Sequence, residues 1–455
     1  MKTLALVSLG CAKNTVDLQV RAGAYLKKGW ALSHDPDRAD AVIVNTCAFI
    51  ESAREEAEAE IRRAIALKAA GNYGRVIVSG CYPQRYPKSA AAFPGVDEWL
   101  GVPAGWEEQR VPGLRLTGRA FAYLKIAEGC SHRCAYCAIP AIRGAYRSRP
   151  LRSILREARA LVGSGCREIN VVAQDPMAWR EGGLRLPDLL RKLDAIPGDF
   201  WSRVLYSYPS EITDGFLDWM VSSPHAVRYI DVPLQHTVPA VLERMNRKGA
   251  VAATLRAAER LRAAVPGVTL RTTVLTGFPG ETERRFRALM DDLRKMEFDH
   301  LGAFAYSPEK GTPGADMPGR PSAAVARERE RMVMAQQKEI WKKRGGRLVG
   351  REFRALVVAP GVARLPSQAP DVDGVVYLEG AIADAPVGEF VDLKIVRRSG
   401  FDFVGGNCKT LVKNAVNRVE QVERVEILHG LHVLHGSKHG SKRALQQVHS
   451  KGDIK

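Results

Sequence analysis

Three short apolar runs near the amino terminus are each followed within three residues by a cysteine, and this arrangement constrains the fold more than any other feature of the sequence. The runs span residues 4–8, 41–45 and 75–79, and their length and composition predict β-strands. Helical patterns lie between them, the clearest over residues 51–70. Strand–helix–strand alternation predicts a parallel sheet with right-handed crossovers. The first domain, residues 1–113, is therefore expected to be an α/β domain.

The cysteines that follow these strands are Cys11, Cys47 and Cys81. Ligands of an open parallel sheet bind outside the carboxyl ends of its strands, so the three thiols should converge at one edge. Gly10 and Gly80 would let the backbone approach a ligand closely. The alternative is three buried structural cysteines, because a free cysteine is often buried. Three cysteines in the same register favour a cluster site over that alternative.

A second set of three cysteines, Cys130, Cys134 and Cys137, lies within one short segment with the spacing Cys-x-x-x-Cys-x-x-Cys. Three thiolates are one too few to fill a tetrahedral zinc site or a four-iron cluster. A four-iron cluster held in this way keeps one iron open to a small molecule. A zinc ribbon is the alternative, and it would need a second Cys-x-x-Cys nearby, whereas Cys166 and Cys408 are isolated in the sequence.

Strand-like and helical segments alternate again around and after this triplet. Six strands with helices outside them predict a partial (β/α)6 barrel over residues 117–345. The predicted strands are residues 121–126, 168–173, 204–207, 229–232, 269–275 and 301–305, and the main predicted helices are residues 151–161, 251–264 and 281–295.

Polar residues at the carboxyl ends of these strands are candidates for cofactor binding, because sites in such barrels lie at that end. The candidates are Gln174, Gln235, His236, Gly277, Gly280 and Glu281. Two alternatives remain open: His236 as a structural histidine, and residues 277–282 as a turn into a capped helix.

The overall composition indicates which kinds of partner and which cellular compartment to expect. The 455 residues carry a net charge of +18, which indicates either an anionic partner such as nucleic acid or a nucleoprotein particle, or simply a basic surface. Eight cysteines in a chain of this length do not suggest a disulfide framework. We expect a cytoplasmic protein with no membrane partner, because neither a signal peptide nor a run of about eighteen apolar residues is found.

These motifs resemble those of a known enzyme family. The triplet of residues 130–137 resembles the signature of radical S-adenosylmethionine enzymes, and together with Cys11, Cys47 and Cys81 it resembles the methylthiotransferases. Within that family, the segments 8–14, 45–50, 172–175 and 231–236 are similar to the branch that modifies an aspartate of ribosomal small-subunit protein twelve. The similarity covers roughly residues 1–405.

The resemblance implies two [4Fe-4S] clusters, and S-adenosylmethionine as both radical source and methyl donor. Cys130, Cys134 and Cys137 would hold the radical cluster, and the three amino-terminal cysteines would hold an auxiliary cluster. The expected reaction is methylthiolation of the β-carbon of the aspartate. The implied partners are ribosomal protein twelve or the assembling small subunit, an electron donor such as flavodoxin or ferredoxin, and a sulfur carrier.

A third domain, the small TRAM β-barrel, is implied over residues 347–405, joined to the core by a helix over residues 323–344. Residues 351–402 carry six basic and eight acidic side chains. Because phosphate contacts dominate binding to RNA, this acidic barrel fits a basic ribosomal protein better than RNA. The alternative function is methylthiolation of a modified adenosine in tRNA.

The last segment, residues 406–455, carries nine basic and four acidic side chains together with several histidines. We expect a disordered basic tail. The alternative is a metal site formed by the closely spaced His429, His432, His435 and His439.

Overall fold

The computed structural model describes residues 1–106, 115–247 and 251–407. Its amino-terminal domain is a parallel five-stranded sheet in the order β2-β1-β3-β4-β5. The predicted strands correspond to β1 (Thr3–Ser8), β3 (Ala41–Thr46) and β4 (Val76–Gly80), and the predicted helix corresponds to α2 (Glu51–Ala69). The helical pattern expected between the first two of these strands corresponds to α1 (Ala12–Leu26). The sequence did not predict β2 (Ala31–Leu32), β5 (Glu98–Leu100) or α3 (Cys81–Arg85).

The middle domain contains six parallel strands in two groups, β6-β9-β12 and β13-β14-β15. A bridge between Ser202 and Ala226 connects β12 to the segment that leads into β13. This arrangement confirms the predicted partial barrel. The strands are β6 (Phe121–Lys125), β9 (Glu168–Val172), β12 (Trp201–Val204), β13 (Tyr229–Asp231), β14 (Thr269–Thr276) and β15 (His300–Ala305).

Helices cover the outside of these strands, and their apolar faces form the largest core of the molecule. They are α5 (Leu151–Gly163), α6 (Leu186–Asp194), α7 (Asp214–Ser222), α9 (Val251–Ala264) and α10 (Glu283–Met296). The short helix α8 (Pro239–Arg244) packs instead in a separate apolar cluster with Phe278 and Tyr306. Short elements flank them: β7 (Ala127–Glu128), α4 (Ile139–Arg143), β8 (Arg147–Ser148), β10 (Arg180–Glu181) and β11 (Leu184–Arg185). No helix of the described residues is both long and apolar enough to cross a membrane.

One predicted strand, residues 204–207, is wrong in its position. The strand β12 ends at Val204, because Tyr206 adopts a left-handed conformation with φ of 71°. The amides of Tyr206 and Ser207 bond to the side chain and backbone oxygens of Asp231, so this segment is a loop that turns toward β13. The true strand contains the buried Arg203, and a charged residue is an unusual signal for a buried strand.

The helix α11 (Ala323–Gly346) leads into a closed five-stranded barrel with the order β16-β17-β18-β20-β19. Its strands are β16 (Glu352–Ala359), β17 (Val362–Arg364), β18 (Val376–Leu378), β19 (Phe390–Ser399) and β20 (Asp402–Asn407). The last strand continues two residues past the predicted boundary at 405. The predicted tail is otherwise outside the described residues, as are its histidines and Cys408.

The loop between β17 and β18 closes the base of the partial barrel. Asp373 on this loop accepts a hydrogen bond from the hydroxyl of Tyr229 at 2.7 Å, and its carboxylate lies 3.5 Å from the side chains of both Arg271 and His300. The guanidinium of Arg203 donates to the carbonyl of Pro366 at 2.9 Å. The barrel is therefore joined to the core through buried polar contacts.

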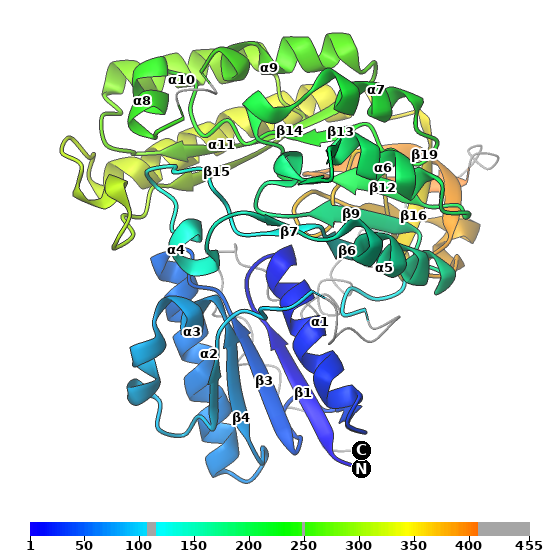
Figure 1. Ribbon diagram of the computed structural model, residues 1–455. Helices are drawn as coiled ribbons and strands as arrows, with labels where there is room; N and C mark the ends of the chain where they lie inside the picture. The colour runs from blue at the N-terminus through cyan, green and yellow to red at the C-terminus, as the bar shows by residue number, and fades with distance from the viewer. Residues whose placement is uncertain (107–114, 248–250, 408–455) are drawn as a thin grey trace, which may run out of the picture.

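In Figure 1 the amino-terminal sheet stands below the partial barrel, with the carboxyl ends of β1, β3 and β4 directed toward it. Glu309, which follows β15, ties the two domains together. Its carboxylate forms ion pairs with Arg54 of α2 and, at 3.0 Å, with Arg85 of α3. The side chains of Glu309 and Arg85 are 1% and 6% exposed, so this pair is buried at the domain boundary.

Candidate functional site

The three amino-terminal cysteines lie at the carboxyl ends of neighbouring strands, as the sequence predicted. Cys11 follows β1, Cys47 follows β3, and Cys81 begins α3 directly after β4. The side chain of Asn14 binds the intervening loops, because its amide donates to the carbonyls of Leu9 and Thr46 at 3.1 and 3.0 Å. Its carbonyl oxygen lies 3.5 Å from the Cys81 sulfur and 3.9 Å from the Cys11 sulfur.

Gly10 and Gly80 allow this close approach. Gly10 has φ of 93°, and a Cβ at this position would lie 2.8 Å from Cβ of Cys47. Gly80 has φ of 101°, and a Cβ there would lie 2.7 Å from the carbonyl oxygen of Thr46. Any larger residue would therefore push the cysteine-bearing loops apart.

The thiols of this set influence one another electrostatically. Burial and the neighbouring Cys81 and Cys11 raise the pKa of Cys47 to about 12. Burial would also raise the pKa of Cys11, but the cationic Lys13 and Arg143 hold it below its usual value. A cationic surrounding favours thiolate, which is the form that binds metal.

The second cysteine set occupies the loop between β7 and α4. Gly129 has φ of 75°, and a Cβ there would lie 2.3 Å from the carbonyl oxygen of Ala145. The amide of Cys130 bonds to the carbonyl of Gly144 at 3.1 Å, which folds the loop back on itself. Burial, together with the charges of Asp175 and Cys134, raises the pKa of Cys130 to about 11. Burial and the neighbouring thiols raise the pKa of Cys137 to about 12.

Aromatic and charged side chains surround this second set, and sequence reasoning missed three of them, His132, Tyr136 and Arg247. His132 lies between two of the cysteines, and its Nε2 is 2.7 Å from the carboxylate of Asp175. Its ring stacks on Tyr208 with centroids 3.9 Å apart. Arg247 also lies beside this cysteine set. Its guanidinium is 4.4 Å from the centre of the Tyr208 ring and donates to the hydroxyl of Tyr136 at 3.1 Å. The histidine between the cysteines was the available signal.

Each cysteine set has the donor chemistry of an iron–sulfur site. Among the described residues, no three His, Cys, Asp or Glu side chains converge closely enough to hold a single metal ion. A cluster spreads its thiolate ligands over different irons, so its ligands stand farther apart than those of one ion. Three cysteines without a fourth acidic or histidine ligand fit a cluster with one open iron better than a zinc ion.

Two of the six cofactor candidates, His236 and Glu281, lie buried against each other. His236 is 0% exposed, its Nδ1 accepts from the amide of Val238 at 3.0 Å, and its Nε2 lies 3.4 Å from the Glu281 carboxylate. Glu281 also accepts from the amide of Gly277 at 3.0 Å and from Arg329 of α11 at 2.7 Å. This arrangement matches the structural alternative, in which both residues support the loop.

The two glycine candidates are required by packing. A Cβ on Gly277 would lie 2.3 Å from Cβ of Ala326, and a Cβ on Gly280 would lie 2.7 Å from Cδ of Arg244. The capped helix that the sequence left open as an alternative is present, because the Thr282 side chain accepts from the amide of Arg285 at the start of α10.

The two glutamine candidates lie at strand ends and are partly exposed. The Gln174 amide donates to Glu128 at 3.0 Å, so this side chain is tied to the residue two positions before Cys130. Gln235 has φ of 68°, an unusual conformation for a residue with a side chain. Strain of this kind is frequent at functional sites.

A ring of four buried charges lies between the two cysteine sets. Lys125 pairs with Asp17 at 2.5 Å and with Glu128 at 2.7 Å. Arg143 pairs with the same two carboxylates, at 2.9 Å to Asp17 and 3.0 Å to Glu128. This ring could not be predicted from the sequence, because its members come from four separate elements.

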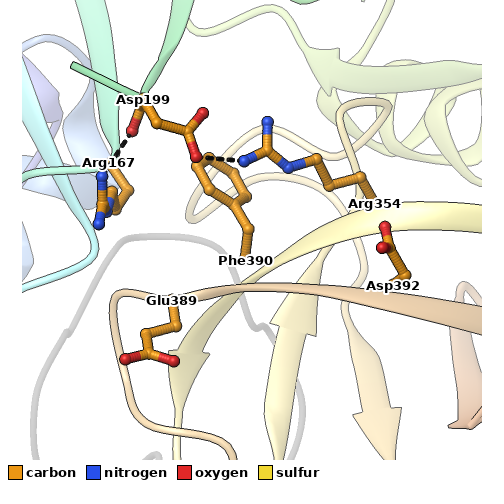
Figure 2. Close-up of a pocket in the computed structure, with 6 residues that line it drawn as sticks. All are labelled: Arg167, Asp199, Arg354, Glu389, Phe390 and Asp392. Atoms are coloured by element: carbon orange, nitrogen blue, oxygen red, sulfur yellow. Dashed lines mark hydrogen bonds and ion pairs between the residues drawn. The ribbon is translucent and has the colours of Figure 1, made fainter.

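A polar hollow between the core and the barrel lies apart from both cysteine sets. Figure 2 shows its lining residues, with the exposed carboxylates of Glu389 and Asp392 on the barrel side. Arg354 forms an ion pair with Asp199 and covers the Phe390 ring at 3.8 Å. None of the six cofactor candidates lines this hollow.

Comparisons with protein families divide the chain in the same way. Residues 3–101 match "Uncharacterized protein family UPF0004", residues 124–293 match the radical SAM superfamily, and residues 349–407 match the TRAM domain. A protein of Kitasatospora setae, described as the radical S-adenosylmethionine methyltransferase TsrM, aligns at a TM-score of 0.49 and 18% identity over 69% of this chain and 77% of its own.

Curated relatives match over most of their length. "Ribosomal protein uS12 methylthiotransferase RimO" of Moorella thermoacetica is 41% identical, over 89% of this chain and 99% of the relative. The protein of the same description from Geobacter sulfurreducens is 39% identical, over 88% of this chain and 98% of the relative.

Proposed function

The chain belongs to the RimO family of radical S-adenosylmethionine methylthiotransferases, and on this premise we propose that it methylthiolates the β-carbon of an aspartate in ribosomal protein uS12. The observation that carries the proposal is the presence of two separate three-cysteine sets, one at the edge of the amino-terminal sheet and one in the loop after β7. One set suffices to generate a radical, whereas the second provides a place for the sulfur that is inserted.

Cys130, Cys134 and Cys137 would hold the radical [4Fe-4S] cluster, and Cys11, Cys47 and Cys81 would hold an auxiliary [4Fe-4S] cluster. When bound, the clusters and S-adenosylmethionine would supply the electron, the radical, the sulfur and the methyl group. The chain positions these groups and excludes water from them. An electron donor such as flavodoxin or ferredoxin and a sulfur carrier are the proposed partners, in the cytoplasm.

The six cofactor candidates are proposed to act around S-adenosylmethionine in two ways. Gln174 and Gln235 are partly exposed at strand ends, which supports direct contact with the cofactor. Glu281 and His236 are buried, and their contacts to Gly277 and to each other support a role in shaping the loop of Gly277 and Gly280.

The charge of the third domain supports a protein substrate. Glu389 and Asp392 are exposed on the barrel surface beside the hollow of Figure 2, and such carboxylates attract a basic protein and repel phosphate. The assembling small subunit is a possible form of this substrate. Methylthiolation of tRNA is the competing function.

Mass spectrometry of a strain that lacks the gene separates the two substrates. Loss of a methylthio group from uS12, restored by the gene on a plasmid, is the expected result. Loss of a methylthio nucleoside from tRNA, with uS12 unchanged, would contradict the proposal.

Iron analysis tests the two clusters. The anaerobically reconstituted protein should bind about eight iron atoms per chain. Replacing Cys11, Cys47 and Cys81 together by alanine should halve the iron and leave reductive cleavage of S-adenosylmethionine. Cys166→Ala is the control, because this buried thiol donates to the carbonyl of Glu168 and belongs to neither set. Unchanged iron in the triple variant would exclude the auxiliary cluster.

A further inference from the structure

The Arg143 side chain of the middle domain reaches the amino-terminal cysteine set. Its Nη2 lies 3.2 Å from the sulfur of Cys81 and 2.6 Å from the side-chain oxygen of Asn14. Asn14 in turn faces the sulfurs of Cys81 and Cys11. The Arg143 side chain is 1% exposed, so water does not screen its charge from the sulfur.

The charge ring holds this guanidinium in place. Arg143 contacts Asp17 through one side of its fork and Glu128 through the other, and Lys125 completes the ring behind them. Glu128 also accepts from the amide of Gly129, which precedes Cys130. The ring therefore fixes the position of Arg143 relative to both cysteine sets.

We propose that Arg143 is a positioning residue of the auxiliary site, which holds its positive charge against Cys81 and raises the reduction potential of the cluster bound there. This inference rests on the proposed role of the three amino-terminal cysteines. One-electron reduction adds negative charge to a cluster, and a fixed buried cation stabilises that reduced form more than the oxidised form. Hydrogen bonds to ligand sulfurs act in the same direction, as is general for iron–sulfur sites.

The ring also explains how a cation is kept at this buried place, because the attraction of its paired carboxylates offsets the cost of desolvating it. Two carboxylates face two cations, so the buried group is neutral as a whole while the guanidinium is the member nearest the sulfur. Lysine could supply the charge at residue 143 but not the planar fork that spans Asp17, Asn14 and Glu128 together.

The test measures the potential of the auxiliary cluster alone. Replacing Cys130, Cys134 and Cys137 by alanine removes the radical cluster, and the full-length protein is then titrated with dithionite and followed by EPR. At a fixed solution potential, R143Q should lower the ratio of reduced to oxidised cluster at least tenfold, which is about 59 mV for a one-electron couple. R143K should give a smaller decrease, because its ammonium withdraws from the sulfur.

The control is R149Q in the same background. Arg149 is as buried as Arg143, at 1% exposed, but its guanidinium contacts Ser153, the carbonyl of Lys125 and Glu157. This variant should keep the potential of the background protein.

The outcomes separate the inference from the proposed function. A background protein without about four iron atoms contradicts the auxiliary cluster itself. If the R143Q variant binds the auxiliary cluster and its reduction potential equals that of the R149Q variant, the proposed role of Arg143 is wrong. If R143Q holds no cluster, the test uses R143K instead. A reduction potential of the R143K cluster equal to that of the background protein overturns the inference.

Discussion

Replacing Glu168 by glutamine should loosen the barrel from the core. Glu168 is the first residue of β9 and is 0% exposed. Its carboxylate pairs with Arg203 of β12 at 2.8 Å and with Arg364 of β17 in the barrel. Glutamine has nearly the same shape but carries no charge, so the variant leaves two buried guanidiniums facing one neutral oxygen.

The cost follows from the burial of all three side chains. Removing one partner of a buried ion pair destabilises a protein by about 3–5 kcal/mol, and we expect about 3 kcal/mol because the amide oxygen keeps one hydrogen bond. Glu379→Gln is the matched control. It breaks the pair with Arg397, whose side chains are 54% and 48% exposed, and exposed pairs contribute about 0.5 kcal/mol.

Urea unfolding followed by tryptophan fluorescence measures the difference, because Trp201 packs 4.9 Å from Phe390 at the junction of core and barrel. At a slope of about 3 kcal/mol per M urea, the midpoint of Glu168→Gln should fall by about 1 M. A midpoint within about 0.2 M of the Glu379→Gln control would refute the reasoning.

The pH dependence provides a second check on Glu168. Burial would raise the pKa of Glu168, but Arg364 and Arg203 hold it below the ordinary value of 4.5. A carboxylate with a lowered folded-state pKa stabilises the protein above the unfolded pKa and loses this effect as the pH falls through the folded value. The difference between the native protein and Glu168→Gln should therefore be constant from about pH 6 to 8.

Three further outcomes are expected. Gly10→Ala should lower the iron content from about eight to about four per chain, because the new Cβ would meet Cys47. The control Gly29→Ala, which is also at positive φ but has no atom within 4 Å of the new Cβ, should keep all the iron. Glu309→Gln should make the amino-terminal domain more sensitive to limited proteolysis without loss of iron, because Arg54 and Arg85 lose their shared carboxylate. Equal digestion rates of the variant and the native protein would show that this contact does not hold the two domains together. Replacing both Glu389 and Asp392 by lysine should weaken uS12 binding about fivefold, or ~1 kcal/mol, in low salt, and an effect that persists in high salt would show that charge is not its cause.

The sequence predicted those features that depend on residues close to one another. The strands with a following cysteine and the six-stranded core are visible as local patterns, and the convergence of Cys11, Cys47 and Cys81 follows from the parallel topology. The capped start of α10 could be predicted from Thr282, because N-cap residues have a local signature.

The remaining features depend on contacts between residues distant in the sequence. Arg203 and Glu168 are charged residues in buried strands, and only the arrival of Arg364 from the barrel explains why they are tolerated there. Arg143 and Asp17 likewise pair across a domain boundary. The packing roles of Gly277 and Gly280 depend on Ala326 and Arg244, which cannot be identified as their neighbours without the fold.

The loop between β17 and β18 has a consequence for synthesis of the chain. Asp373 supplies the partner for Tyr229, Arg271 and His300, which are translated well before it. Domains generally fold from the amino terminus as the chain emerges. The middle domain therefore emerges from the ribosome before the carboxylate that completes its base. Arg271 already has Asp231 at 3.3 Å, whereas Tyr229 and His300 gain the Asp373 carboxylate only when the last domain has been made. A chain that is cut short within the barrel would leave its catalytic domain a substrate for chaperones and proteases.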